Sequence, residues 1–310
     1  MAEKDITEKL LTDIDEVFAD IYNNLCFKGE NIIKPDDLSN ASVTTAFISN
    51  DVTRGLISDV SKIYKNSNLT LALLNIENQS TEDSDMPFRI IGYEGAKYNS
   101  QLISGSNERY AVATLVLNFN TKKRWSTPKS IKESLKNKYP IELDEYINDY
   151  KVNVIDVAFL EKEDIEKLNS DFKAVAKYYY LKRNNIEDFE ELGDCNLKYP
   201  VQTFATMKAL TGDSRFETAY NDYVETHKDD KEVTMEKILD TLMNKGRLEG
   251  EARGEARGRF ETLTKNLKSL ISKNHTFEES CELLDVDEET KEKLLETGEF
   301  SVDSFKQAFN

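Results

Sequence analysis

Residues 69–102 read LTLALLNIENQSTEDSDMPFRIIGYEGAKYNSQL. The run over 69–77 is mostly apolar and ends in one carboxylate, Glu77, which is typical of a strand buried on both faces. Apolar residues then recur at helical spacing over 87–103 and predict a helix. A buried strand followed directly by a helix favours an α/β fold.

Apolar patterns on both sides extend this unit. Three further strands are predicted, over 56–64, 110–119 and 152–160. Four further helices are predicted, over 6–25, 162–183, 200–211 and 213–226. The KNSN sequence at 65–68 favours a hairpin turn, and residues 26–50 are expected to form loop and short turns. We therefore expect one α/β domain over residues 1–230.

Residues 231–310 differ in character, because they show helical patterns and no strand signal. The segment GRLEGEARGEARG at 246–258 has glycine at every fourth position. This spacing aligns the glycines on one helical face, and each costs about 1 kcal/mol of helix propensity relative to alanine. The segment is either a flexible charged linker or a marginal helix that needs a partner. We expect a glycine-striped charged helix or linker over 231–273 and a small acidic helical unit over 274–310.

The charge and the cysteines exclude several classes of protein. The net charge of −17 argues against a broad basic surface for duplex DNA, although local cationic contacts and a bound metal can still serve a nuclease. Three scattered cysteines and two histidines indicate neither a zinc site nor a disulfide framework. The charged N-terminus and the lack of a long apolar run favour a cytoplasmic protein without a membrane span.

One group of polar residues has the composition of a metal-dependent hydrolytic site. Asp59 lies in the strand predicted before the turn, and Glu77 ends the strand after it. A hairpin brings these strands side by side, and Gln79 projects to the same face as Glu77 while the chain stays extended. Two carboxylates and waters suit Mg²⁺, and their mutual repulsion is relieved when a metal binds.

The sequence around these residues resembles a known nuclease family. The IENQS segment is followed by an MP-x-R-x-x-x-Y helix and a further Tyr and Gln, here Glu77, Gln79, Met86, Pro87, Arg89, Tyr93, Tyr98 and Gln101. Residues 18–38 and the TLVLNF strand followed by Trp125 extend the similarity over about residues 15–230. The chain thus resembles the Rpn (recombination-promoting nuclease/putative transposase) branch of the PD-(D/E)xK nucleases. Gln79 replaces the superfamily's usual lysine, and Ser58 stands where the branch usually has arginine.

The resemblance implies a fold, an activity and a set of site residues. The fold would be a PD-(D/E)xK, restriction-endonuclease-like core with a helical C-terminal extension. The activity would be Mg²⁺- or Mn²⁺-dependent cleavage of DNA, linked to recombination, mobile elements or defence against phage. Asp59 and Glu77 would hold the metal and Gln79 would complete the catalytic set.

Other residues are candidates for supporting roles. Asp20 on the first helix is a candidate further metal ligand, although an acidic residue there is more often solvated or capping. Arg89, Tyr93 and Lys62 are candidate DNA contacts. Taken alone, Arg89 and Tyr93 could equally form a surface cation–π pair, and Asp59 could be an ordinary polar residue on a strand.

Two other functions remain open. A catalytically weak or inactive nuclease-fold protein could act by protein–protein interaction through the helical tail, which the acidity and Gln79 favour. A strand-joining transposase is implied only by the family's name, and no DDE-type triad is evident. We also expect a homodimer formed through the C-terminal helices. By resemblance, a short C-terminal product of the same gene could start at Met235 or Met243.

Overall fold

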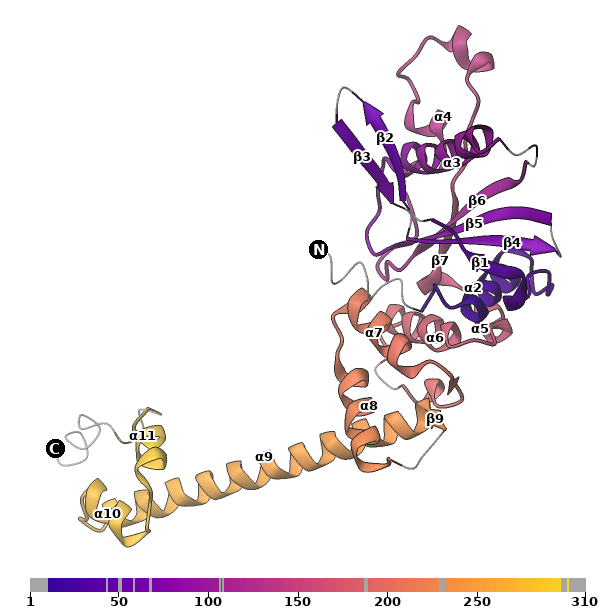
Figure 1. Cartoon of the computed structure of the whole chain (residues 1–310). Helices are drawn as coiled ribbons and strands as arrows, with labels where there is room; N and C mark the ends of the chain where they lie inside the picture. The colour runs from indigo at the N-terminus through magenta and orange to yellow at the C-terminus, as the bar shows by residue number, and fades with distance from the viewer. Residues whose placement is uncertain are drawn as a thin grey trace. The chain divides into compact units, whose positions relative to one another are not determined.

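The computed structural model describes residues 11–42, 44–49, 52–57, 59–66, 69–105, 107, 109–186, 189–228, 232–296 and 300. The chain divides into two compact units, Met1–Leu242 and Met243–Asn310. A mixed sheet with helices on both faces forms the first unit, so the predicted α/β class is confirmed (Figure 1).

A five-stranded sheet lies at the centre of the first unit, with the strand order β1–β4–β5–β6–β7. These strands are β1 (Leu38–Asn40), β4 (Val60–Asn66), β5 (Leu69–Gln79), β6 (Ala111–Asn118) and β7 (Asn153–Asp156). Strand β4 is antiparallel to both β1 and β5, whereas β6 and β7 run parallel to β5. The predicted hairpin is therefore present as β4–β5.

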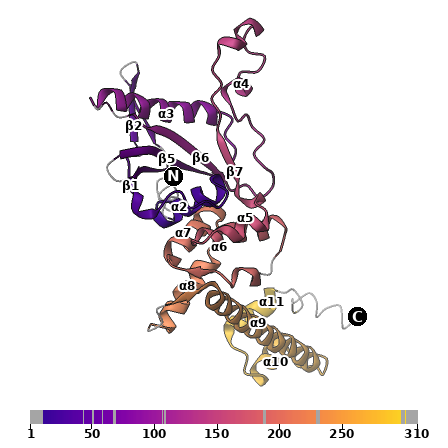
Figure 2. The same cartoon turned by 90° about the vertical axis from the view of Figure 1, so that its right-hand side faces the viewer.

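Helix α3 (Met86–Ile103) makes the crossover from β5 to β6, which parallel neighbours require. It lies across one face of the sheet, while α2 (Asp15–Ile21) and α6 (Phe172–Arg183) lie on the other (Figures 1 and 2). The side chains of β6 alternate between the two faces. Val116 packs with the α3 residues, and its neighbours Leu115 and Leu117 belong to the larger core with α2 and α6.

The other helices of the first unit extend the core on the α2 side (Figure 1). They are α5 (Lys162–Lys167), α7 (Pro200–Thr211), α8 (Arg215–Thr226) and the beginning of α9 (Met235–Ile271). Strands β2 (Thr44–Ser49) and β3 (Val52–Ile57) form a separate hairpin, and the short helix α4 is Ile131–Ser134. The two-residue strands β8 (Asn196–Leu197) and β9 (Val233–Thr234) pair with each other, so the segment predicted to lack strands contains one.

Three predicted boundaries in the sheet were wrong. Residues 26–50, expected to be loop, contain β1 and β2. The predicted strand 56–64 is divided, because β3 ends at Ile57 with β2 as its partner and β4 begins at Val60 with β5 as its partner. Asp59 therefore precedes a strand instead of lying within one, and Ser58 is outside the described residues. The strand predicted at 152–160 ends at Asp156 in a 3₁₀ turn.

Two predicted helices also differ from the structure. In the described part of 6–25, the helix begins only at Asp15, and a π-helical turn over Tyr22–Cys26 follows it. The helix predicted at 162–183 is two helices, α5 and α6. The break occurs because the Asp20 carboxylate accepts the N–H groups of Asn169 and Ser170, which a continuous helix would bond internally.

The second unit is a small helical assembly with its own core. The C-terminal part of α9 packs with α10 (Phe277–Leu283) and α11 (Glu288–Glu296). Its buried apolar residues are Leu267, Phe277, Cys281, Leu294 and Phe300. A capping box between Thr276 and Glu279 begins α10. No helix in the described part of the chain combines the length and apolar character that crossing a bilayer requires.

Candidate active site

The centre of the candidate site is formed where β4 begins and β5 ends. Val60 is the register partner of Ile76, so the antiparallel pairing places Asp59 beside Glu77. The Asp59 N–H donates to Glu77 Oε1 at 3.2 Å, and the Asn78 N–H donates to Asp59 Oδ2 at 2.8 Å. Glu77 is only 1% exposed. Each carboxylate is thus oriented by a backbone N–H of the segment beside it.

Gln79 is the last residue of β5 and lies on the same face of this strand as Glu77. Its carbonyl accepts the Phe119 N–H at 2.8 Å, and its register partner is Asn118 at the end of β6. Asn118 is in turn the partner of Asp156 at the end of β7. The carboxyl ends of the three parallel strands therefore form one polar edge.

Arg89 supplies a positive charge beside the carboxylates. From the first turn of α3, its Nη2 lies 3.7 Å from Glu77 Oε2 and its Nη1 lies 2.8 Å from Asp83 Oδ2. Its Nε and Nη2 also donate to the Tyr93 hydroxyl at 3.2 and 3.1 Å. Burial raises the pKa of Tyr93, and the charge of Glu77 adds to the rise. Both candidate DNA contacts on α3 thus lie within the site, where Arg89 offsets part of the expected repulsion between the carboxylates.

Lys62, the third candidate DNA contact, is on the wrong face of the sheet for that role. Its side chain is only 2% exposed, and its Nζ lies 2.9 Å from both Asp13 and Asp15 and bonds Asn40. Lys62 is paired with Leu74 of the α2-side core, whereas Glu77 lies on the α3 face. Strand alternation alone already predicts this difference, because positions 59 and 62 are three residues apart and project to opposite faces of an extended strand.

Asp20 has a structural role away from the Asp59–Glu77 pair. Its carboxylate accepts hydrogen bonds from Asn169 N, Ser170 N, Ser170 Oγ and Asn24 Nδ2, at 2.6–3.1 Å. These bonds tie α2 to the loop between α5 and α6. No three His, Cys, Asp or Glu side chains in the described part of the chain are grouped closely enough to hold a metal ion, so Asp20 does not join the other two carboxylates.

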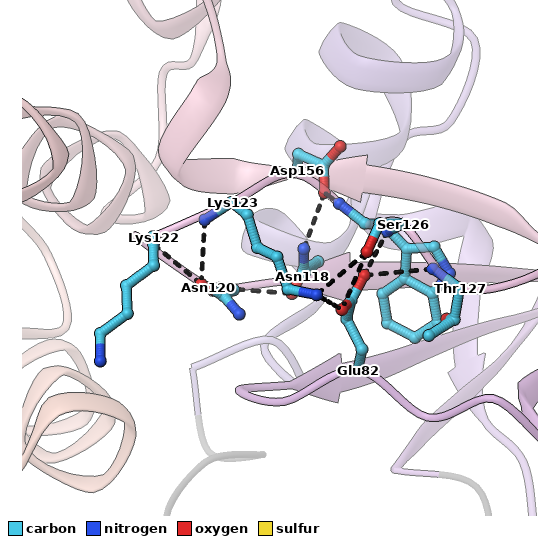
Figure 3. Close-up of polar contacts among 9 residues, drawn as sticks. Glu82, Asn118, Asn120, Lys122, Lys123, Ser126, Thr127 and Asp156 are labelled. Atoms are coloured by element: carbon cyan, nitrogen blue, oxygen red, sulfur yellow. Dashed lines mark hydrogen bonds and ion pairs between the residues drawn. The ribbon is translucent and has the colours of Figure 1, made fainter.

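A loop after β6 is fixed against this polar edge (Figure 3). The Asp156 carboxylate accepts Asn118 Nδ2 at 2.7 Å and the Trp125 N–H at 2.8 Å. Glu82, three residues after Gln79, bonds Lys123 Nζ and the Ser126 N–H. Hydrogen bonds from these two groups lower the pKa of Glu82 to about 2. Glu82 and Asp156 were not predicted as site residues, although Asp156 directly follows an apolar run, as Glu77 does.

Comparison with models of known protein families assigns the chain to one of them. The model of the family described as "Putative transposase, YhgA-like" matches residues 9–195, which include the sheet, α3 and the site residues. The chain belongs to this family. The predicted resemblance to the Rpn-type nucleases is thereby confirmed. No curated protein and no solved structure matches the chain.

In this YhgA-like chain, the face of the sheet beneath α3 is polar beyond the site itself. Ser61 Oγ donates to Asn75 Oδ1 at 2.6 Å, and Asn75 Nδ2 donates to Thr114 Oγ1 at 3.1 Å. Glu94 of α3 continues this row through hydrogen bonds from Tyr150 and Thr114, and burial raises the pKa of its carboxyl. The polar row fixes the position of α3, and hence of Arg89, over the sheet.

These side chains fit a magnesium ion, which needs few protein ligands, better than a metal whose ligands all come from the protein. Asp59 and Glu77 are the two carboxylates, and Gln79, on the same strand face as Glu77, has an amide that can orient a bound water. Mg²⁺ is commonly bound through one or two carboxylates, with substrate phosphates and waters as the other ligands. In this YhgA-like chain, Asp59 and Glu77 are the residues that would hold such an ion.

Proposed function

We propose that the chain is a metal-dependent DNA endonuclease with a PD-(D/E)xK core. The observation that carries this proposal is the pairing of Asp59 and Glu77, in which Glu77 accepts the Asp59 N–H and Asp59 accepts the Asn78 N–H. Family membership supports a nuclease or transposition-related role. Recombination, mobile-element activity or phage defence is the setting that the family favours.

Asp59 and Glu77 would hold Mg²⁺ or Mn²⁺ at the open end of the β4–β5 hairpin, opposite its turn. Such a metal lowers the pKa of its bound water and polarises a phosphate. The protein groups position the reactants around it. The Gln79 amide can hydrogen-bond a water but cannot take up its proton. Arg89, 3.7 Å from Glu77, provides the positive charge that a lysine at position 79 would otherwise supply.

The test is cleavage of plasmid DNA by the full chain with Mg²⁺ or with EDTA. Asp59→Asn and Glu77→Gln keep the size and one acceptor oxygen of each side chain while removing its charge. We expect nicking in Mg²⁺ only, and near-complete loss in both variants. Glu163→Gln, at an exposed position of α5, is the matched control and should cut at the parental rate. Equal cleavage by all four proteins would contradict the proposal.

A second candidate function is a nuclease-fold protein that acts by protein–protein interaction. The net charge of −17 and the glutamine at position 79 favour it. The same plasmid experiment separates the two functions. A purified full chain that never cleaves, in Mg²⁺ or in Mn²⁺, supports the interaction protein and contradicts the endonuclease.

The helical tail is the proposed site of self-association. An added Cβ at Gly246, Gly250, Gly254 or Gly258 would meet nothing within 4 Å in this chain. Four i,i+4 ion pairs stabilise this stretch by about 1–2 kcal/mol in total, whereas four glycines cost about 3–4 kcal/mol. A partner helix on the glycine face would supply the difference.

A short C-terminal product is a further proposed partner. Met235 is fully buried at the start of α9, so a role in the core is enough to account for a methionine there. Met243 is 57% exposed and has no such role. Immunoblotting of a C-terminally tagged chain tests this idea. A short band that disappears in Met243→Leu supports the internal start, and full-length protein alone contradicts it.

A further inference from the structure

Two arginines converge on one aromatic ring near the candidate site. The Arg124 guanidinium carbon lies 5.1 Å from the centre of the Phe159 ring, and that of Arg183 lies 4.8 Å from it. Arg183 also lies 5.4 Å from the centre of the Tyr180 ring. Lys162 Nζ lies 5.5 Å from the same ring. Aromatic faces hold these cations in fixed positions at the surface.

This cationic cluster adjoins the polar edge that carries the candidate active site. The Trp125 N–H binds Asp156, and Arg124 Nη2 donates to the Phe159 carbonyl at 3.3 Å. Asp156 is two strands from Gln79 in the same register, through Asn118. Neighbouring strands lie about 4.8 Å apart, so the arginines are within a few nucleotides' reach of Asp59 and Glu77.

The loop that carries Arg124 is held in place by the Glu82 and Asp156 contacts (Figure 3). Asn120 Oδ1 also accepts the N–H groups of Lys122 and Lys123, at 2.8 and 3.3 Å. The exposed Lys122 side chain points away from the Glu82 cluster (Figure 3). A fixed loop loses little further entropy when it binds a ligand.

The charges around the cluster leave it cationic. Lys123 is committed to Glu82, and Lys162 pairs with Glu191 at 3.0 Å. Glu161 lies 3.9 Å from Arg124, and both side chains are more than half exposed, so this ion pair is weak. Two guanidinium groups and the Lys122 ammonium thus remain for an anion, in a chain whose net charge is −17.

We propose that Lys122, Arg124 and Arg183 bind the phosphate backbone of duplex DNA and lead it across the carboxyl edge of the sheet. This inference rests on the proposed function, because it takes Asp59 and Glu77 as the place of cleavage. Guanidinium groups match phosphate oxygens in a bidentate manner. The Phe159 ring already holds the two arginines, which favours phosphate contacts over the stacking of an unpaired base.

The experiment measures binding without cleavage. The full chain carrying Glu77→Gln is titrated into a fluorescent duplex in Mg²⁺, and anisotropy is recorded at several salt concentrations. Arg124→Gln with Arg183→Gln should weaken binding by about tenfold or more at 0.1 M salt and lower the slope of log K against log salt by about 2. Lys34→Gln with Lys65→Gln, exposed residues near the opposite end of β4, are the matched control and should bind as the parent does.

A charge-retaining variant separates binding from folding. Arg124→Lys with Arg183→Lys should keep the salt slope of the parent, and thermal melting checks that each variant is folded. Unchanged affinity and slope in the folded glutamine variant would overturn the proposal, as would a parent that binds no duplex. Weakened binding in a chain that never cuts plasmid would instead support this surface and reject the endonuclease.

Discussion

The backbone N–H of Asp59 donates a hydrogen bond to Glu77 Oε1 at 3.2 Å, across the start of β4 and the end of β5. The next N–H along β5, that of Asn78, returns a bond to Asp59 at 2.8 Å. Two carboxylates are thereby brought together without a third acidic partner in the described residues. Replacing either residue with its amide leaves an acceptor oxygen for these bonds, so loss of charge can be separated from loss of structure.

Gln79 is expected to position water without holding the metal. Gln79→Ala should therefore reduce the cleavage rate by about 10²–10³-fold, the usual loss for one positioned polar group. Gln79→Lys restores the common superfamily pattern and should retain activity. Single-turnover cleavage rates in Mg²⁺ measure both. Parental activity in Gln79→Ala would show that this amide has no part in the reaction.

Lys62 should matter for stability and not for DNA. Lys62→Met removes a buried cation from between Asp13 and Asp15, and it leaves the buried Oδ1 of Asp15 without its ion-pair partner. We expect a loss of about 3 kcal/mol in the free energy of unfolding, the lower end of the usual cost of removing one partner of a buried ion pair, measured by urea denaturation, with unchanged duplex affinity. Lys65→Met, at an exposed position on the same strand, should change neither. Reduced duplex affinity of Lys62→Met at full stability would restore Lys62 as a DNA contact.

Glu82 should make the loop after β6 sensitive to acid. Its pKa in the folded chain is about 2, against an ordinary value of 4.5. Because the folded pKa is lowered, its stabilising contribution is present above pH about 4.5 and is lost as the pH falls toward 2. Glu82→Gln should therefore be less stable than the parent at neutral pH, and the difference should vanish near pH 2. A stability difference that does not depend on pH would contradict this role.

The glycine face of α9 is expected to form a dimer contact. Light scattering on the full chain should give the mass of a dimer, and Gly250→Leu with Gly254→Leu should give a monomer, because the larger side chains prevent close approach. Ala252→Leu, on a different face of the helix, is the control and should remain dimeric. A monomeric parent at all concentrations would end the dimer proposal.

Much of the first unit could be predicted from the sequence, because its apolar periodicity matches the strands and helices that form. The run over 69–77 lies within β5, the helix after it is α3, and β4 pairs with β5 as the predicted hairpin. The break at Asp59 could not be predicted, because it arises from the pairing of β3 with β2 and of β4 with β5. The face that Lys62 occupies relative to Asp59 follows from strand alternation. Its ion pairs with Asp13 and Asp15, and the bonds of Asp20 to Asn169 and Ser170, join residues distant in sequence, and periodicity does not specify them.

The C-terminal helices also show what a sequence pattern leaves unspecified. The glycine spacing favoured a marginal helix but left a charged linker open, and the structure has one helix over Met235–Ile271. Leu263, Leu267 and Ile271, at helical spacing, pack into the small core with α10 and α11. A pattern of apolar residues predicts that a helix face is buried. It does not show whether the segment that packs on it belongs to the same chain or to another.

The most direct test of the account is the single-turnover cleavage rate as a function of Mg²⁺ concentration, for the parent and for Glu77→Gln. We predict a parental rate that rises with Mg²⁺ to a plateau. We predict a Glu77→Gln rate that stays at least about 10²-fold lower at every concentration, because one of two metal ligands is lost. A Glu77→Gln chain that cuts at the parental rate, or a parental rate independent of Mg²⁺, would show that Asp59 and Glu77 are not the catalytic centre.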